Sequence, residues 1–430
     1  MVKLKLTPLQ IGALALWAAM LVFGLWAMMA RLSRGHLDAA YGSYVVWGLQ
    51  VSAYIYFIGL SAGAFLMSSL VYVFHIKALE RVARLALVLA LITLVMALVA
   101  IWTDIGHMER FYLIFTRPNF HSMMAWMIWF YTAYFLLMVC EAFLAFRPEL
   151  VALAARGGFV GRLVGLVPKR FLSDGPDERA FNARWLTRLG ALGIPLAFFF
   201  HGGVGALFGT LEARPYWNTT VYPILFLTGA LLSGGALLAA VVAVFWPKGD
   251  PERPSIIGAI AGFVVALLLV DLMIEWAEYS IPLWYGTGPE SDFLRHVLFG
   301  PYWWMFWVVH IGLGVVVPLA LLSTPALRRN PRAVAVSGGL IASTFFAVRL
   351  NIVIPGLVNP NFQALSEAYV DTRLTFDYFP SAMEWGIFWF AVALGVALFL
   401  AANRLLPLWG SSLAPMPSAA SPEAAREAGA

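Results

Sequence analysis

The amino-acid sequence predicts an all-α polytopic membrane protein, with about ten transmembrane helices built around two parallel four-helix bundles. Three observations support this fold class. Hydrophobic residues make up 61% of the 430 residues and charged residues only 12%, which leaves more apolar surface than a soluble core can bury. Apolar runs of about 20 residues, the length that crosses a bilayer as a helix, recur along the chain. A short apolar motif also occurs twice.

Ten apolar runs are candidate spans, and Gly, Pro or charged residues mark their ends. The first run is expected to remain as a membrane helix, because it is about 20 residues long and lacks the small-residue cleavage site of a signal peptide. The ten predicted spans cover residues 11–30, 51–74, 85–102, 123–146, 186–208, 221–245, 256–276, 302–322, 335–355 and 382–405.

The repeated motif indicates a duplicated unit. Residues 60–66 read L-S-A-G-A-F-L, and residues 232–238, which lie 172 positions later, read L-S-G-G-A-L-L. Each copy opens a set of four spans. The predicted parts are therefore a first helix with its outer loop (1–44), a first bundle (45–220), a second bundle (221–380), a last helix (381–410) and a disordered tail (411–430).

The positions of lysine and arginine predict the orientation, because cytoplasmic loops retain more of them than translocated loops do. With the N-terminus inside, 19 of these residues fall on the cytoplasmic side and seven on the outer side. Both termini are therefore expected in the cytoplasm, with the chain in the inner (plasma) membrane and residues 147–184 forming a basic cytoplasmic loop. Arginines dispersed over short loops make no groove for a nucleic-acid backbone, so no nucleic-acid partner is expected.

Charged residues inside the predicted second bundle mark one candidate site, because charge within a span is costly. In span seven, Asp271, Glu275 and Glu278 follow one another at i, i+4 and i+7, which places them on one helix face. Arg349 in span nine lies at the same depth as Asp271, and His310 of span eight lies nearby. Two interpretations stay open: a structural ion pair between Arg349 and Asp271, or a functional role as a proton path or a headgroup contact.

The predicted first bundle carries a different polar set. Asp104 ends span three, His121 precedes span four and His201 lies inside span five. An acid and imidazoles beside aromatic walls suit a quinone, because its carbonyls need hydrogen bonds and its ring needs an apolar slot. We therefore expect Asp104, His121 and His201 to act on a quinone. The residues expected to contact the ring are Tyr54, Tyr56, Gly63, His107 and Trp126.

The single cysteine and the spacing of the histidines limit the cofactors of this chain. Cys140, in the fourth span, is the single cysteine. The chain can therefore form no internal disulfide and cannot by itself ligate an iron–sulfur cluster. His201 and His310 fall in different bundles, and no span holds two histidines at haem-ligating spacing. We therefore expect no haem, cluster or other metal on this chain, and any iron–sulfur cluster must lie on another subunit.

Several short motifs, taken in their order along the chain, resemble the NrfD-type family. That family comprises cofactor-free membrane subunits of respiratory complexes, including polysulfide reductase and alternative complex III. The resemblance implies a quinol bound near the outer face and electrons passed to an iron–sulfur subunit docked there. One departure is that an arginine and a proline of the family pattern are replaced after Asp104, where this chain reads Asp-Ile-Gly-His-Met. The motifs are residues 54–66, 104–110, 118–126, 349–356 and 378–385.

Residues and resemblance together predict a quinone-reactive membrane subunit of a respiratory oxidoreductase. Its expected partners on the outer side are an iron–sulfur electron-transfer subunit and a catalytic or cytochrome subunit. Proton movement in the second bundle is a further expectation. The alternative is an ion- or solute-coupled secondary transporter, since internal repeats and midplane charges also occur there; four spans in each unit give a parallel repeat, whereas such transporters often use inverted ones.

Overall fold

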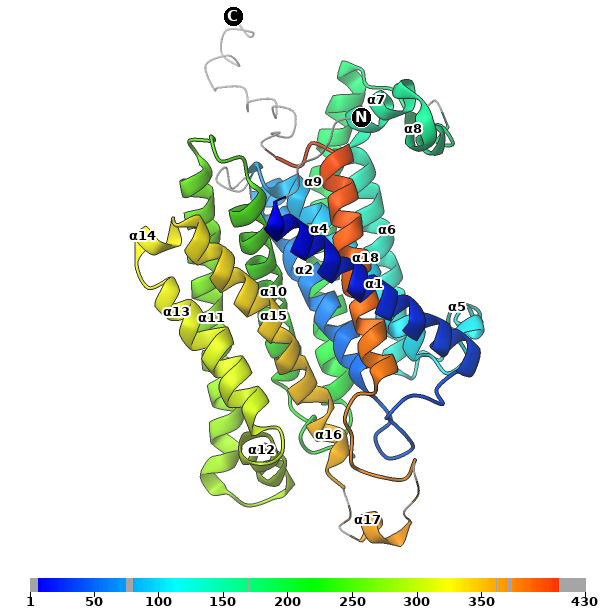
Figure 1. Ribbon diagram of the computed structural model, residues 1–430, viewed down its shortest axis with the longest axis vertical. Helices are drawn as coiled ribbons and strands as arrows, with labels where there is room; N and C mark the ends of the chain where they lie inside the picture. The colour runs from blue at the N-terminus through cyan, green and yellow to red at the C-terminus, as the bar shows by residue number, and fades with distance from the viewer. Residues whose placement is uncertain are drawn as a thin grey trace, which may run out of the picture.

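The computed structural model describes residues 7–74, 80–168, 171–360, 362, 364–369, 371 and 373–409. The tail predicted to be disordered, residues 411–430, lies outside the described residues. Within the described residues, helices alternate in direction between two ends of the molecule (Figure 1).

Nine helices of the described chain are long and apolar enough to cross a membrane. A tenth apolar segment consists of the π-helix η3 (Met305–Val316) continued by α13 (Val317–Leu321). The predicted all-α polytopic fold is therefore confirmed. The nine long helices are α1 (Pro8–Arg34), α2 (Leu49–Phe74), α4 (Ala83–Asp104), α6 (Met123–Ala145), α9 (Pro176–Gly209), α10 (Tyr222–Phe245), α11 (Arg253–Tyr285), α15 (Pro331–Val353) and α18 (Ala382–Leu405).

Short helices lie at both ends of the molecule. The α7 end, at the top of Figure 1, carries α7 (Arg147–Arg156), α8 (Gly158–Val164) and α14 (Pro325–Arg328). The α12 end, at the bottom, carries α12 (Pro289–Phe299), α16 (Pro355–Val358) and α17 (Leu365–Ala368). Two further short helices, η1 (Met108–Arg110) and α5 (Leu113–Thr116), follow α4.

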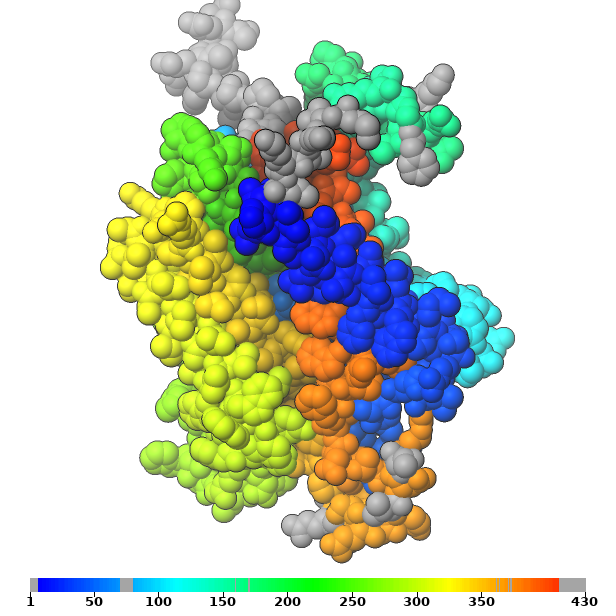
Figure 2. Space-filling view, viewed as in Figure 1, coloured from blue at the N-terminus to red at the C-terminus, as the bar shows by residue number. Residues whose placement is uncertain are grey.

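The long helices pack as two groups. α2 and α6 each pack against both α4 and α9, so these four helices, the first unit, form a closed ring. In the second unit, α10 packs against α11 and α15, and η3 packs against α15. The units meet where α2 packs against α10 and α15. α1 lies outside both units and crosses α18, as the dark blue helix over the orange one in Figure 2.

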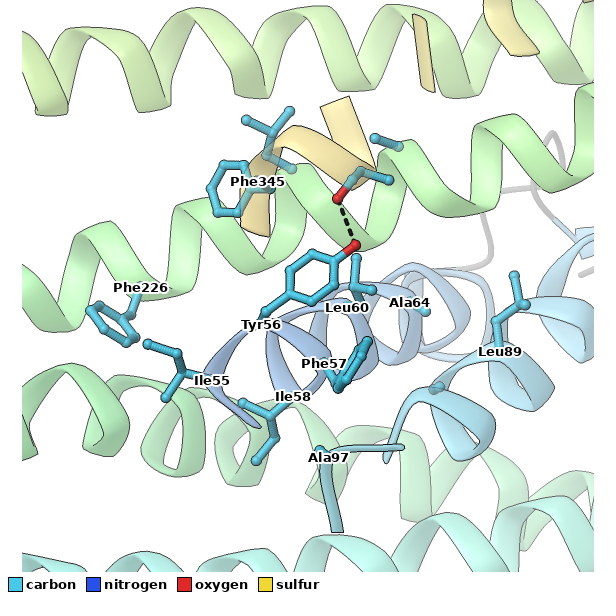
Figure 3. Close-up of a cluster of buried hydrophobic side chains, with 14 of the residues drawn as sticks. Ile55, Tyr56, Phe57, Ile58, Leu60, Ala64, Leu89, Ala97, Phe226 and Phe345 are labelled. Carbon is cyan, nitrogen blue, oxygen red and sulfur yellow. Dashed lines mark hydrogen bonds between the residues drawn. The ribbon is translucent and has the colours of Figure 1, made fainter. Parts of the chain in front are cut away.

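The two copies of the repeated motif lie against each other at the contact between α2 and α10. A Cβ atom on Gly63 would lie 2.0 Å from the carbonyl oxygen of Ala230, and one on Gly234 would lie 2.6 Å from the Cα of Gly63. Glycine alone permits this approach. In the same region the hydroxyl of Tyr56 donates to the carbonyl oxygen of Ala342 at 2.8 Å (Figure 3). Small residues in α2 and α10 thus bring the two units together.

Residues 147–184 are not the simple loop that the sequence predicted. They form α7, α8 and the first turns of α9, and α7 carries Glu149 in its first turn, where the helix dipole favours an acid. Arg147 donates to the carbonyl oxygen of Phe171 at 2.8 Å and to Oδ1 of Asn182 at 3.1 Å. These bonds hold the segment against the start of α9.

Candidate functional site

A polar cluster of half-buried side chains surrounds the buried Arg31 at the α12 end of α4. Arg31 of α1 is 3% exposed; its Nε donates to the carbonyl oxygen of Thr103 at 2.7 Å and its Nη2 to that of Ile105 at 2.6 Å. These two residues flank Asp104 in the chain. Within the described residues, Oδ1 of Asp104 is buried and has no hydrogen-bond partner. Buried carboxylate oxygens are usually paired, so this atom is a candidate acceptor for a ligand's hydroxyl.

His36 and Tyr41 complete this group, which we call the Arg31 cluster (Arg31, His36, Tyr41 and Asp104). Nη2 of Arg31 donates to Nε2 of His36 at 2.9 Å, and Nδ1 of His36 bonds the hydroxyl of Tyr41. Burial, and then the charge of Arg31, lowers the pKa of His36, so its ring is neutral at pH 7. Burial raises the pKa of Tyr41 and keeps its phenol protonated. The sequence reasoning missed Arg31, His36 and Tyr41, because the first helix and its loop were assigned to no bundle.

The start of α18 closes the same end of the molecule. Oε1 of the fully buried Glu384 accepts from the hydroxyl of Tyr378 at 2.5 Å, and its Oε2 accepts from the backbone N–H groups of Ala40 and Ser381 at 3.0 Å each. The hydroxyl of Tyr378 also accepts from the N–H of Leu49 at 2.7 Å. Glu384 therefore fixes the loops that precede α2 and α18 beside the Arg31 cluster.

His201 lies at the centre of the molecule. It is 0% exposed, and neither of its ring nitrogens has a hydrogen-bond partner among the described residues. Its ring centroid is 6.2 Å from that of Phe226, and a Cβ on Gly59 would lie 3.7 Å from its Cε1. In the described chain, no hydrogen bond or ring contact joins His201 to Asp104 or to His121. The structure therefore does not bring the three predicted residues together.

Three other predicted residues lie on the surface. His107, His121 and Trp126 are all exposed. Nδ1 of His107 is 3.1 Å from Oε1 of Glu109, and Nε1 of Trp126 donates to the carbonyl oxygen of Phe120 at 2.9 Å. These side chains can meet a ligand or a partner only at the surface of this end, because they do not face the interior of the first unit.

The predicted ring contacts in α2 have different surroundings from one another. Tyr54 faces Tyr131 within the first unit, with ring centroids 6.4 Å apart. Tyr56 is bonded to α15 and so faces the second unit. Gly63 leaves no space for a flat ring, because the backbone of α10 at Ala230 fills the place of its side chain. Of these three residues, Tyr54 alone lies on the side of the first unit.

The second unit contains a cavity of about 180 Å³ on the α12 side of its core. Asp271, Glu275 and Glu278 of α11 line it, and so does Arg349 of α15. Its aromatic walls are Tyr216, Tyr222, Tyr279 and Phe345. Four of the five residues that the sequence marks in the second bundle therefore line one cavity, and His310 does not.

Two of the acids that line this cavity, Asp271 and Glu275, form hydrogen bonds with polar neighbours. Oδ1 of Asp271 accepts from the hydroxyl of Thr228 at 3.0 Å. Oε2 of Glu275 lies 2.8 Å from Nε2 of His310, which belongs to the π-helix η3. π-Helical turns are frequent at functional sites, because the wider turn displaces a side chain from its α-helical position. The pairing of Glu275 with His310 was not part of the sequence prediction.

Arg349 is held by aromatic rings rather than by the acid predicted for it. Its guanidinium carbon lies 4.3 Å from the ring centroid of Phe226 and 5.1 Å from that of Phe345, and its Nη2 is 3.4 Å from the carbonyl oxygen of Phe226. No ion pair joins Arg349 to Asp271 in the part of the chain that the structure describes. The two groups face the same cavity, so the predicted direct pair is replaced by two separate attachments.

Glu141 of α6 is a further buried acid that the sequence reasoning missed. It is 1% exposed, and both carboxylate oxygens have no hydrogen-bond partner among the described residues. The sequence signal that could have identified Glu141 is the presence of an acidic residue inside the apolar run of the fourth span. Groups of three or more His, Cys, Asp or Glu side chains placed to hold a metal ion are not found within the described ranges.

The fold and these two buried polar sites define a polytopic helical membrane protein that carries ionisable groups inside its helical units. The model of the family described as "Polysulphide reductase, NrfD" matches residues 39–361, about three quarters of the chain. The chain belongs to this NrfD family, which confirms the resemblance seen in its motifs.

Curated relatives cover most of the chain. This chain is 33% identical over 396 residues to a selenate reductase subunit of Mesobacillus selenatarsenatis, and the match covers 90% of this chain and 92% of the relative. It is 26% identical to the Hdr-like menaquinol oxidoreductase integral membrane subunit of Archaeoglobus fulgidus, covering 79% of each. It is 25% identical to the menaquinone reductase integral membrane subunit of Nitratidesulfovibrio vulgaris, covering 90% of this chain and 89% of the relative. The first relative is named as a subunit of a selenate reductase, and the other two are named as integral membrane subunits of a menaquinol oxidoreductase and a menaquinone reductase.

Proposed function

We propose that this chain is the quinol-reactive membrane subunit of a respiratory oxidoreductase complex. Its family supports the proposal, since two relatives are named for menaquinol or menaquinone. The Arg31 cluster supports it chemically, because it places a carboxyl, an imidazole and a phenol at one end of an apolar unit. A quinone ring with two carbonyl oxygens needs this combination of polar groups and apolar surroundings.

The observation that carries the proposal is the buried Oδ1 of Asp104. A quinol hydroxyl is a donor that can satisfy it, and the carboxylate can accept the proton as the quinol is oxidised. Arg31, fixed by two backbone carbonyls, holds positive charge beside this carboxylate. Oxidation of a quinol releases two protons and two electrons, so more than one acceptor is needed. We assign the neutral His36 and the exposed His121 to the route by which protons reach the surface.

The electrons pass, in this proposal, to an iron–sulfur subunit that docks at the α12 end, where a catalytic or cytochrome subunit completes the complex. The Arg31 cluster lies at this end, so docking here keeps the distance for electron transfer short. The segment after α4 also exposes Phe111 and Tyr112. Aromatic residues are enriched in protein interfaces, which suits this segment to a partner.

We further propose that the α7 end faces the cytoplasm and the α12 end faces outward from the inner (plasma) membrane. Arg156, Arg162 and Arg328 are among the basic residues of the α7 end, and cytoplasmic ends are rich in such residues. Protons from the quinol are then released on the outer side.

Replacement of the acid tests the proposal. In the assembled complex, Asp104→Asn removes the proton acceptor with little change in shape, and we expect quinol-dependent turnover to fall about tenfold or more, which corresponds to roughly 1.4 kcal/mol. The control is Glu212→Gln, which removes an exposed acid from the loop after α9 at the same end. Co-purification of the partner subunits shows that each variant is assembled.

Parent-like turnover in Asp104→Asn would place the quinol elsewhere. His201→Ala is measured in parallel, because its imidazole is enclosed at the centre of the molecule. Turnover that falls in His201→Ala and not in Asp104→Asn would move the reacting site from the Arg31 cluster to the contact between the units.

A further inference from the structure

The cavity of the second unit has a buried polar side and an open side, where the apolar Ala277 and Ile281 lie together with the exposed Asn218 and Glu290. Ala277 and Ile281 line it and are also exposed on α11, and Ile281 is 63% exposed. Asp271, Glu275 and Arg349 line it and are buried. A molecule in the surrounding apolar phase can therefore enter past Ile281 and place its polar atoms against the buried groups.

Arg349 has donor capacity that the protein does not use. It is 1% exposed, and its Nε has no hydrogen-bond partner among the described residues. An arginine side chain offers five N–H donors and no acceptor, and a buried donor without a partner is costly. A ligand oxygen in the cavity would satisfy this guanidinium.

The internal repeat gives an independent argument. Asp104 ends α4, the second helix of the first unit, and Asp271 and Glu275 lie in α11, the second helix of the second unit. Each unit thus carries an acid on its corresponding helix, with Asp271 buried and Asp104 buried at its Oδ1, and Arg31 and Arg349 place a buried arginine in each neighbourhood. The second unit repeats the chemical elements of the Arg31 cluster around a preformed cavity.

We propose that this cavity is a second quinone-ring site, distinct from the Arg31 cluster; the class of ligand rests on the proposed function. Arg349 donates to one ring oxygen. At the other ring oxygen, the carboxylate of Asp271 or Glu275 accepts from the hydroxyl of a quinol, and the same carboxyl group, when protonated, donates to the carbonyl of a quinone. The phenol rings of Tyr216 and Tyr279 and the ring of Phe345 form the walls. The site binds a ring, and no electron transfer is assigned to it.

The size of the cavity limits the ligand. Its volume of about 180 Å³ is below the roughly 300–1,000 Å³ of pockets that enclose drug-sized ligands. A quinone head group fits this space and its long apolar tail does not, so the tail leaves past Ile281 and Pro282. A polar cavity of this size also holds water, and occupation by water alone is the outcome that the experiment must separate.

Photolabelling of the assembled complex in lipid nanodiscs tests the proposal. The probe is an azido-naphthoquinone with a short apolar tail, and labelled peptides are located by mass spectrometry. We expect label in two regions, on α11 or α12 and near the Arg31 cluster, and an excess of unlabelled naphthoquinone should reduce both. Ile281→Trp fills the open side without changing a charge, and Arg349→Gln removes the donor. Each should reduce label on α11 and α12 at least tenfold and leave the first region unchanged.

The control is Asp292→Asn, which removes an exposed acid from α12 outside the cavity and should leave both regions labelled. Label confined to the Arg31 cluster would show that the second cavity holds water only and would overturn this proposal while leaving the proposed function intact. Label on α11 that persists in Ile281→Trp and Arg349→Gln would also overturn it, as contact with the lipid-facing surface. Label on α11 without label near Asp104 would support this site and overturn the assignment of the Arg31 cluster.

Discussion

Gly63 of α2 and Gly234 of α10 touch through their backbones, because a Cβ atom on Gly234 would lie 2.6 Å from the Cα of Gly63. Each glycine belongs to one copy of the repeated motif, so the two copies form the contact between the units. Close contacts of this kind stabilise helix pairs in membranes through packing, since the hydrophobic effect does not drive helices together within lipid.

This contact predicts that Gly63→Ala is destabilising. The new Cβ would meet the backbone carbonyl of Ala230, which cannot move away without shifting α10, and overpacking typically costs about 1–3 kcal/mol. Thermal unfolding in detergent should show a lower midpoint. Gly235→Ala is the matched control, because its Cβ would lie 3.6 Å from the nearest neighbouring atom, a methyl of Val264, an ordinary contact. Equal midpoints for the two variants would contradict the packing argument.

Arg349 and Asp271 are predicted to couple only weakly, because they share a cavity and form no direct ion pair in the described structure. Each is attached to other groups. A double-mutant cycle of Arg349→Met and Asp271→Asn, measured by chemical unfolding, should give a coupling energy of about 1 kcal/mol, because the two opposite charges still attract across the cavity that they share. A buried pair would instead make each single change cost about 3–5 kcal/mol, with much of that recovered in the double variant; a coupling of that size would restore the ion pair that the sequence predicted.

A pH effect is predicted for Arg81 and Asp250, which join the turn before α4 to the turn before α11 at the α7 end. Nη2 of Arg81 is 2.5 Å from Oδ2 of Asp250, and this hydrogen bond lowers the pKa of Asp250 below its ordinary value of 3.8. A lowered pKa in the folded state adds stability above pH 3.8, and that stability is lost as the pH falls through the folded pKa. Arg81→Gln should therefore lower the melting temperature at pH 6 and have less effect at pH 3. An effect that is the same at both values would show that the ion pair does not contribute.

Orientation is predicted to place α8 inside and α12 outside the cell. In a Cys140→Ser background, Leu166→Cys lies just after α8 and Asp292→Cys lies on α12, and both positions are exposed. A membrane-impermeant thiol reagent added to intact cells should label Asp292→Cys alone, and permeabilised cells should allow both to react. Labelling of Leu166→Cys in intact cells would reverse the orientation and move the proposed quinol site to the cytoplasmic side.

Most of the fold could be predicted from the sequence, because apolar length and the small-residue repeat are local signals. The predicted last span, residues 382–405, matches α18 in full. α9 begins at Pro176, well before the predicted start at 186, because charged residues can continue a helix beyond the membrane. The helices in residues 147–164 were missed for the same reason, since hydropathy detects burial in lipid and not helix formation in water.

The candidate sites were only partly predictable. Single acidic residues such as Asp104 and Asp271 can be recognised in the sequence because they interrupt or end apolar runs. The partners of these acids cannot be recognised in the same way, because Arg31 belongs to α1 and Thr228 to α10. A contact between helices that are distant in the chain produces no pattern in the sequence of either helix. In the described structure, Arg349 forms no ion pair with Asp271, because its guanidinium contacts the ring and the carbonyl oxygen of Phe226. The matching depth of Arg349 and Asp271 along their helices correctly predicted that they lie in the same region. The rotation of each helix about its axis, which depth does not give, determines which side chains touch.

Each unit contains an even number of crossings, so the chain returns to the side from which it started before the second unit begins. The acids of α4 and α11 consequently approach the same compartment. A ligand that reaches either acid from solution therefore comes from the same side of the bilayer. A chain with an odd number of crossings in each unit would instead have placed its two acids toward opposite sides of the bilayer.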